Sequence, residues 1–360
     1  MASSLIALFH RAAATALALA FCLGLPPAAA QSQPPLRLRV VGSLANLNQY
    51  VRHEEPFWTR ELPRLSGGQL SADIVPFDRA GVRGQEILRL VQLGAVPFGT
   101  VLLSLSAAEE PELGAPDLAG QNADIGALGQ TVSAFRPYLE KMLRERYGVE
   151  LLGLYTYPAQ VVFCNKPFTA LSDLAGRRIR TSSPTQSDLV EALSGVPVRT
   201  SFAEIVPNIK TGNVECAITG AMSGHALGLH QVTTHVHTMA VNWGLSALVA
   251  NAQHWKSLPG SAQSLLKQEL PKLEQAIWAD AERETLAGVA CLTGQASCPE
   301  GQRGRMVEVR PAPSDEKRRK ELFSSVVLPR WVQRCGAECA RMWNGTLAPT
   351  AGVEVGTPKR

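Results

Sequence analysis

The sequence lacks the motifs that mark nucleotide chemistry and carries little net charge. It contains no P-loop and no Gly-x-Gly-x-x-Gly motif, so no nucleotide cofactor is indicated. The net charge is only +4 over 360 residues, which is too small to favour nucleic-acid binding. With 45% hydrophobic and 18% charged residues, the chain is typical of a soluble globular protein, and its length allows two domains of about 150 residues.

The histidines do not form a recognisable metal motif. His225 and His230 are five residues apart, which would place them about 140° apart on a helix. His235 and His237 would share one face of a strand, but no carboxylate or Cys-x-x-Cys completes a ligand set. We therefore expect no metal site, no cofactor and no catalytic residues.

The first 30 residues differ from the rest of the chain. His10 and Arg11 precede an apolar run to Leu25, and Ala28–Ala30 offer small residues for cleavage. This pattern predicts a secretory signal peptide over residues 1–30, cleaved near Ala30/Gln31. We expect the mature chain to be periplasmic, soluble and monomeric, with no further membrane-spanning stretch.

Six cysteines follow the predicted signal peptide, and an even number in an exported chain favours disulfides. Cys291–Cys298 and Cys335–Cys339 are the local pairings, but pairing between these two segments is equally allowed. Cys164 and Cys216 can pair if their strands are neighbours.

Residues 171–220 alternate between strand and helix patterns. Strands are predicted at 178–181, 195–198 and 214–218, with helices at 182–193 and 202–210. This spacing implies parallel pairing, and such sheets bind ligands beyond the carboxyl ends of their strands. Arg180 lies near the end of its strand, just before a helix start, where a guanidinium and free backbone N–H groups favour a carboxylate or phosphate.

The same region carries a family resemblance. Leu174-Ala-Gly-Arg-Arg-Ile-Arg180, Gly195-Val-Pro-Val198, Phe202-Ala-Glu204 and Gly212-Asn-Val-Glu-Cys216 follow in the order seen in solute-binding proteins of tripartite ATP-independent periplasmic (TRAP) transporters. The sequence resembles this dicarboxylate-binding family over roughly residues 37 to 345. The resemblance implies that Arg180 pairs with a ligand carboxylate, and that a two-part membrane permease receives the ligand.

The resemblance also implies an α/β fold of two lobes. We expect mixed and parallel sheets flanked by helices, strands that cross a hinge, and a long helix that spans both lobes, with a break at Pro271. Lobe I would comprise residues 36–155 and 243–285, and lobe II residues 156–242 and 286–345. Residues 346–360 are predicted to be a disordered tail.

Other polar residues are candidates for the same ligand site. Asn46 and Asn48 follow the first predicted strand, and Ser104 follows the third. Trp243 lies where the chain recrosses between the lobes, as a pocket wall or a core residue; Tyr155 and Tyr157 are further hinge candidates.

The sequence departs from the family pattern at two positions. Gln160 lies nearest to the place of a second arginine, and Thr219 replaces a frequent asparagine. A second carboxylate would therefore meet only neutral groups, which favours a monocarboxylate or an acid with a neutral tail.

The sequence thus predicts a binding protein, not an enzyme, that captures a small organic acid and delivers it to a permease. Two alternatives remain at this point. The chain could be a receptor that presents its ligand to a sensor, or a secreted hydrolase using Cys164 or Cys216 with a histidine.

Overall fold

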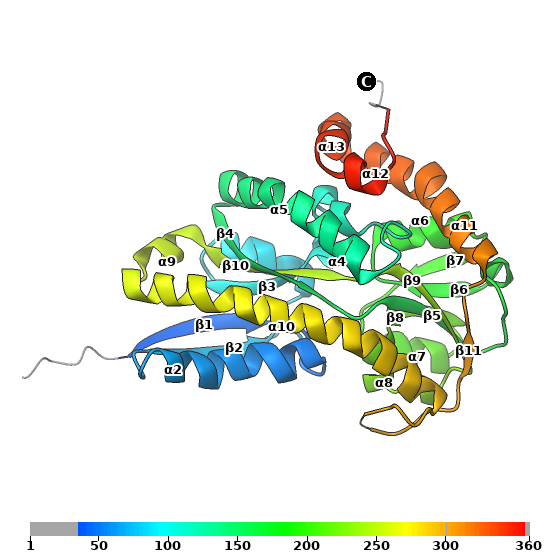
Figure 1. Cartoon of the computed structure of the whole chain (residues 1–360), viewed down its shortest axis with the longest axis horizontal. Coiled ribbons are helices and arrows are strands. Elements are labelled where there is room, and N and C mark those ends of the chain that lie inside the picture. Colours follow the sequence, from blue (N-terminus) through cyan, green and yellow to red (C-terminus); the bar gives the residue numbers. More distant parts are fainter. Residues whose placement is uncertain (1–34, 300, 357–360) are drawn as a thin grey trace, which may run out of the picture. The chain divides into compact units, whose positions relative to one another are not determined.

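The computed structural model describes residues 35–299 and 301–356, so the predicted signal peptide lies outside the described residues. The first of two sheets has the strand order β2-β1-β3-β10-β4 (Figure 1). Its strands are β1 (Leu36–Gly42), β2 (Leu70–Pro76), β3 (Phe98–Leu102), β4 (Val149–Thr156) and β10 (Leu245–Asn251). β1 and β3 are parallel, whereas β10 runs antiparallel to both β3 and β4. All five strands lie within the predicted lobe I, apart from the last residue of β4.

The second sheet has the order β11-β9-β5-β8-β6-β7 and lies within the predicted lobe II. β6 pairs in parallel with β7 and β8, as the strand–helix alternation predicts, while β5 is antiparallel to β8 and β9. The strands are β5 (Gln160–Cys164), β6 (Arg178–Thr181), β7 (Val196–Arg199), β8 (Cys216–Gly220), β9 (His235–Asn242) and β11 (Val307–Val309). The expected mixed α/β fold is confirmed.

Two short crossings bring the edges of the sheets together. β4 leads into β5 through residues 157–159, and β9 leads into β10 through residues 243–244. Given the strand directions, the carboxyl ends of β1 and β3 lie at the crossing edge of one sheet. The carboxyl ends of β6 and β8 lie at the crossing edge of the other. This is the place where α/β sheets bind ligands.

Helices cover both sheets, and α10 (Gly260–Thr293) runs along the two of them (Figure 1). α10 packs on β4 and also on α8 (Ala221–Ala226), so it contacts both lobes. The predicted break at Pro271 is wrong, because α10 is continuous there and includes the proline. The remaining α-helices before the C-terminal region are α2 (Leu62–Leu65), α3 (Ile87–Gln92), α4 (Leu103–Ser106), α5 (Ile125–Tyr147), α6 (Pro184–Ala192), α7 (Ile205–Lys210) and α9 (Ala252–Ser257). Short 3₁₀ segments are η3 (Gly84–Glu86), η4 (Pro111–Asp117), η5 (Leu171–Leu174) and η6 (Leu229–Gln231).

Proline explains four widened turns in the helices. The π-helical segments are η1 (Gln49–Glu54), η2 (Phe57–Glu61), η7 (Phe323–Val327) and η8 (Trp343–Leu347). Each π-helical segment ends two residues before a proline. The residue between the segment and the proline donates its N–H to the carbonyl five residues earlier, as Leu62 does to Phe57. A proline inside a helix lacks an N–H and crowds the carbonyl four residues earlier, so a wider turn accommodates it.

The C-terminal region packs on both lobes. α11 (Pro313–Leu322) contacts β9, α12 (Leu328–Cys335) contacts η4, and η8 and α14 (Ala348–Ala351) contact α5, while α13 (Ala337–Met342) packs on α12. In Figure 1 α12 and α13 lie above α5, and α11 lies beside α6. The prediction of disorder is wrong for residues 346–356, because Leu347 is fully buried and the Trp343 indole N–H donates to the Val353 carbonyl at 2.8 Å.

Three disulfides join the six cysteines. Cys164–Cys216 links the neighbouring strands β5 and β8, and the other two bonds are the local pairs Cys291–Cys298 and Cys335–Cys339. Cys164 and Cys216 are bonded to each other, so neither offers the free thiol that the hydrolase alternative requires. No helix among the described residues is both long and apolar enough to traverse a bilayer.

Candidate functional site

Arg180 is a buried cation at the carboxyl end of β6, with only 3% of its surface exposed. Its Nε and Nη2 atoms both donate to the Thr200 carbonyl, at 3.1 and 3.0 Å, and Nη1 donates to the Ile218 carbonyl at 2.8 Å. These carbonyls follow β7 and belong to β8, so the neighbouring strands of β6 fix the orientation of the guanidinium.

The hydrogen bonds of Arg180 leave one part of the guanidinium unused. A guanidinium has five N–H groups, and three are engaged here, which leaves one each on Nη1 and Nη2. Among the described residues no carboxylate pairs with Arg180, and burial alone lowers its pKa to about 10. A buried charge without a partner is costly, so this end of the side chain is suited to a carboxylate that accepts two parallel bonds.

Buried hydroxyl groups lie near the crossing edges. The Thr200 and Tyr155 hydroxyls are buried without a hydrogen-bond partner, and the buried Tyr157 hydroxyl lies beside those of Ser43 and Ser246. Ser246 lies opposite Tyr155 in the β4–β10 register, so the two share a face of the sheet. A Cβ on Gly153 would meet both Tyr155 and Glu274 of α10, so this face is the one that α10 covers.

Glu54 lies beneath the same edge of lobe I. It is fully buried; its Oε2 accepts the N–H and hydroxyl of Ser43 at 2.8 and 2.7 Å, and its Oε1 accepts the hydroxyl of Thr100 at 2.6 Å. Burial raises the pKa of Glu54, although these hydrogen bonds partly offset that effect. The carboxyl group thereby holds Ser43, the first residue after β1.

Thr219 lies on the same face as Arg180, but Gln160 lies on the opposite one. Arg180 pairs with Ala217 and Thr219 with Val161, so these residues share the face that packs on α7 and the end of α10. Gln160, one residue earlier on β5, points the other way and accepts from the Gln186 side chain of α6 at 2.8 Å. Gln160 therefore does not share the face of Arg180, and its side chain lies on the α6 side of the sheet.

The other predicted residues are dispersed. Asn48 donates to Glu284 of α10, Asn46 is exposed and accepts from Arg79, and Ser104 borders a cavity on the α6 side. Trp243 is 4% exposed within the core, and its indole N–H donates to the Asn122 carbonyl at 3.3 Å.

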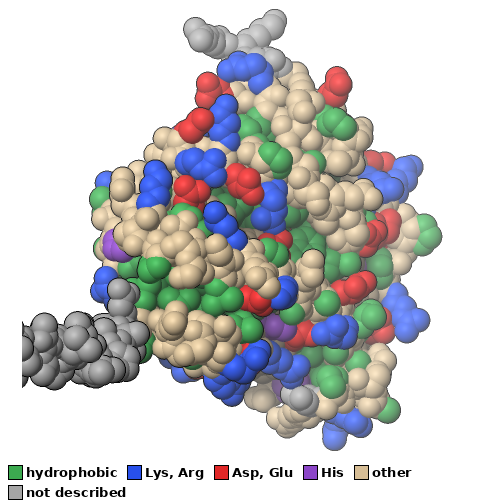
Figure 2. Space-filling view, turned by 60° about the vertical axis from the view of Figure 1, so that its left-hand side comes forward, with side chains coloured by type: hydrophobic (Ala, Val, Ile, Leu, Met, Phe, Trp, Pro, Cys, Tyr) green, Lys and Arg blue, Asp and Glu red, His purple; other side chains and the backbone are tan. Residues whose placement is uncertain are grey.

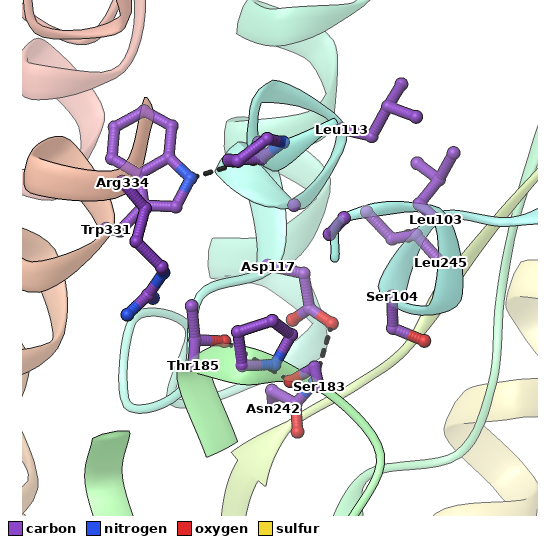
Figure 3. Close-up of a pocket in the computed structure, with 14 residues that line it drawn as sticks. Leu103, Ser104, Leu113, Asp117, Ser183, Thr185, Asn242, Leu245, Trp331 and Arg334 are labelled. Atoms are coloured by element: carbon purple, nitrogen blue, oxygen red, sulfur yellow. Dashed lines mark hydrogen bonds between the residues drawn. The ribbon is translucent and has the colours of Figure 1, made fainter. Parts of the chain in front are cut away.

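Asp117 is a candidate site residue that the sequence did not indicate. It ends η4 and lies mostly buried beside a narrow, partly open cavity, where its carboxylate points toward Asn242 (Figure 3). It accepts the backbone N–H groups of Trp243 and Gly244, at 3.0 and 2.6 Å, and the Asn242 side chain at 3.0 Å. Burial raises the pKa of Asp117 to about 7, although these hydrogen bonds oppose the shift. No local motif marks this residue, since its partners lie about 125 residues away.

The histidines and the surface carry no further chemical signal. Within the described residues, no group of three or more His, Cys, Asp or Glu side chains is arranged to hold a metal ion. His237 is buried and contacts Asp315, while His225 and His230 stack on each other with ring centroids 5.0 Å apart. Figure 2 shows acidic and basic side chains interspersed on one face of the molecule.

Comparison with known proteins identifies the class that this fold and site define. The family model for bacterial extracellular solute-binding proteins, family 7 (DctP), matches residues 45–290. The chain therefore belongs to this family, the solute-binding proteins of TRAP transporters. Comparison with curated protein sequences gives no significant match.

Solved structures share the fold at low sequence identity. The extracytoplasmic solute receptor DctP7 of Bordetella pertussis, which binds pyroglutamic acid, has a TM-score of 0.76 and 20% identity, covering 86% of this chain and 98% of its own. A TRAP periplasmic solute-binding protein from Desulfovibrio salexigens with bound orotic acid has a TM-score of 0.75 and 15% identity, covering 87% and 99%. One from Rhodoferax ferrireducens with bound malonate has a TM-score of 0.75 and 17% identity, covering 87% and 98%.

Proposed function

We propose that this protein is a periplasmic receptor that binds one small organic acid through Arg180 and delivers it to a TRAP-type membrane permease. The observation that carries the proposal is the buried guanidinium with two unused N–H groups and no carboxylate partner among the described residues. A ligand carboxylate would accept both groups and offset the cost of burying the charge.

The remainder of the ligand is proposed to be neutral and polar. Buried hydroxyls lie near the crossing edges, among them those of Thr200, Tyr155 and Tyr157. Hydroxyls donate to carbonyl oxygens, accept from amide N–H groups, and do both with other hydroxyls. They carry no charge, so a second carboxylate would have no cationic partner. The side chain at the place of a second family arginine, Gln160, faces the other side of the sheet.

Pyroglutamate is a suitable first probe for this ligand class. It carries one carboxylate and a lactam with one carbonyl and one N–H, and two Bordetella pertussis receptors of the same fold bind it. Malonate, bound by the Rhodoferax ferrireducens protein, tests the competing case of two carboxylates. Because Arg180 is only 3% exposed, access for either acid requires the lobes to separate.

Calorimetry and thermal shift on the mature protein would test the proposal, with L-pyroglutamate, orotate, malonate and succinate as probes and neutral amides and sugars as controls. A ligand at 100 times its Kd raises stability by about 2.7 kcal/mol, which is a readily measured rise in Tm. We expect monocarboxylates with a polar neutral part to bind more tightly than dicarboxylates.

The matched variants are Arg180→Met and Arg178→Met on the same strand. Arg178 is exposed and bonds to Glu215 and nearby carbonyls, so its loss should leave affinity unchanged. Arg180→Met should weaken binding by at least about 100-fold, because it leaves a ligand carboxylate without a partner in a buried site. Binding that survives in Arg180→Met, or that is confined to neutral solutes, would refute the assignment.

A further inference from the structure

The side chains on the α6 side of the crossings form one continuous hydrogen-bonded chain. Ser182, two residues after Arg180, donates its N–H to the Gln186 side-chain oxygen at 2.7 Å. The Gln186 amide nitrogen donates to the Asn242 oxygen at 2.8 Å, and the Asn242 nitrogen donates to Asp117 at 3.0 Å.

The direction of this chain is fixed from both ends. The backbone N–H of Ser182 can only donate, so Gln186 must accept with its oxygen and donate with its nitrogen. Asn242 must then accept with its oxygen and donate with its nitrogen, which requires an acceptor at Asp117. The Trp243 and Gly244 amides also donate to Asp117, so its carboxylate receives donors from three consecutive residues of the crossing.

This arrangement connects the lobes through residues that the crossing itself provides. Asp117 ends η4, which precedes α5, and Trp243 and Gly244 form one of the two crossings. The segment after Asp117 makes further contacts with lobe II, since the Gly120 N–H donates to the Val241 carbonyl at 2.7 Å and the Ala119 N–H donates to the Thr185 hydroxyl at 3.4 Å.

We propose that the ionised carboxylate of Asp117 is a positioning residue for ligand binding: it holds the crossing at residues 242–244 and, through Asn242 and Gln186, the loop that follows Arg180. The role rests on the proposed function, because Arg180 is the ligand contact being positioned. A protonated Asp117 would place an O–H among three donors, lose at least one acceptor position, and release the crossing.

The role predicts a pH dependence near neutrality, because burial raises the pKa of Asp117 to about 7. Charged neighbours do not interfere: among the described residues lining the adjoining cavity, the other ionisable side chain is Arg334 of α12. It is paired with Asp188 of α6 at 2.9 and 2.5 Å. On η4, Glu112 pairs with Arg146, and α4 and residues 242–244 have no ionisable side chain.

Affinity for L-pyroglutamate, measured by calorimetry from pH 5.5 to 8.0, would test the proposal. The ligand carboxyl remains ionised over this range, since an α-carboxyl has a pKa of about 3.5. We expect wild-type affinity to be about tenfold weaker at pH 5.5 than at pH 8.0, because linkage allows up to about tenfold per pH unit below the pKa. Asp117→Asn should bind weakly at every pH.

A second measurement does not depend on the ligand. Hydrogen–deuterium exchange of the peptide covering residues 241–246, corrected for the intrinsic pH dependence and compared with residues 262–275 of α10, reports on the Trp243 and Gly244 amides. We expect wild-type protection of this peptide to fall at least about threefold from pH 8.0 to 5.5, and Asp117→Asn to be equally unprotected at both. Asp124→Asn is the matched control, since Asp124 caps α5 by accepting from Ala127 at 2.8 Å and asparagine caps equally well.

The two measurements separate the proposals. If the wild-type protein binds no pyroglutamate, the proposed ligand fails and the exchange data alone decide the role of Asp117. The inference would be overturned if amide exchange or affinity in the wild type did not depend on pH. It would also be overturned if Asp117→Asn showed the same pH profile as the wild type. If Asp117→Asn does not fold, Asn242→Ala serves instead: it should weaken affinity at pH 8.0 while the crossing amides stay protected by Asp117, and unchanged affinity would contradict the role.

Discussion

Arg180 and Asp117 are enclosed charges on opposite faces of the region where the chain crosses between lobes, and neither forms an ion pair with another described residue. Their surroundings differ in one respect. The Asp117 carboxylate accepts three donors that the chain itself supplies, whereas Arg180 keeps two N–H groups that no described residue uses. A charge that is saturated internally positions the backbone, and a charge that is only partly satisfied is available to a ligand.

Among the conservative variants that sharpen this comparison, the largest effect is expected for Arg180→Lys. Lysine keeps the positive charge but cannot bond to two backbone carbonyls and present a planar fork to a carboxylate at the same time. We expect affinity for the bound acid to fall between about tenfold and 100-fold, because one to two charged hydrogen bonds are lost. Calorimetry measures the change, and affinity equal to wild type would mean that charge alone is sufficient.

Ionisation of Asp117 should lower the free energy of unfolding, although it should raise ligand affinity. Its folded pKa of about 7 lies above the ordinary value of 3.8, so the folded state holds the proton more tightly and stability falls as pH rises from about 4 to 7. Between pH 5 and 8, the free energy of unfolding of the wild type should fall by about 2 kcal/mol relative to Asp117→Asn. Urea denaturation at the two pH values checks this, and a constant difference would show that Asp117 has an ordinary pKa.

Glu54 tests whether burial of a charge is enough to affect binding. Like Asp117 it accepts three donors, but they come from Ser43 and Thr100, which both belong to lobe I. Glu54→Gln should therefore lower the free energy of unfolding by about 1 to 2 kcal/mol, through a mismatched donor, with affinity changed less than about threefold. A larger loss of affinity than of stability would place Glu54 in the binding site.

The smallest effect on stability is expected for Tyr157→Phe. The Tyr157 hydroxyl lies beside the Ser43 and Ser246 hydroxyls but makes no well-aligned hydrogen bond, so its removal should lower the free energy of unfolding by no more than about 1 kcal/mol. If the neutral part of the ligand bonds to this hydroxyl, affinity should nevertheless fall several-fold. Unchanged affinity for every acid in the panel would remove Tyr157 from the site.

Most of the fold was predictable because local patterns specify it. The strand at Arg178–Thr181, the helix beginning near Ser183 and the Gly-terminated turns follow from capping and periodicity, and the structure places them within a few residues. The face on which Gln160 lies could not be predicted in the same way. Side chains alternate along a strand, so an uncertainty of one residue reverses the face on which a residue lies.

Other features depend on contacts that are distant in sequence. Asp117 follows a Pro- and Gly-containing segment that reads as an ordinary turn, and only the return of the chain at residues 242–244 supplies its donors. The tail around Leu347 is ordered because α5 provides an apolar surface for it, which composition alone does not reveal. The disulfide pairing depended in the same way on which strands became neighbours.

The long helix α10 has a mechanical consequence. Up to Glu284 it is tied to lobe I, through Trp278 to the Leu154 carbonyl and through Glu284 to Asn48. At Gly288 it touches lobe II so closely that a Cβ there would lie 2.3 Å from the Met222 nitrogen. Between these anchors the Thr285 hydroxyl accepts the N–H of Ala159, on the crossing from β4 to β5, at 3.0 Å. The helix therefore passes from one lobe to the other within about one turn, roughly 5 Å. Any opening of the lobes must bend α10 within this turn. The bending stiffness of the helix therefore limits how far, and in which direction, the two lobes can move.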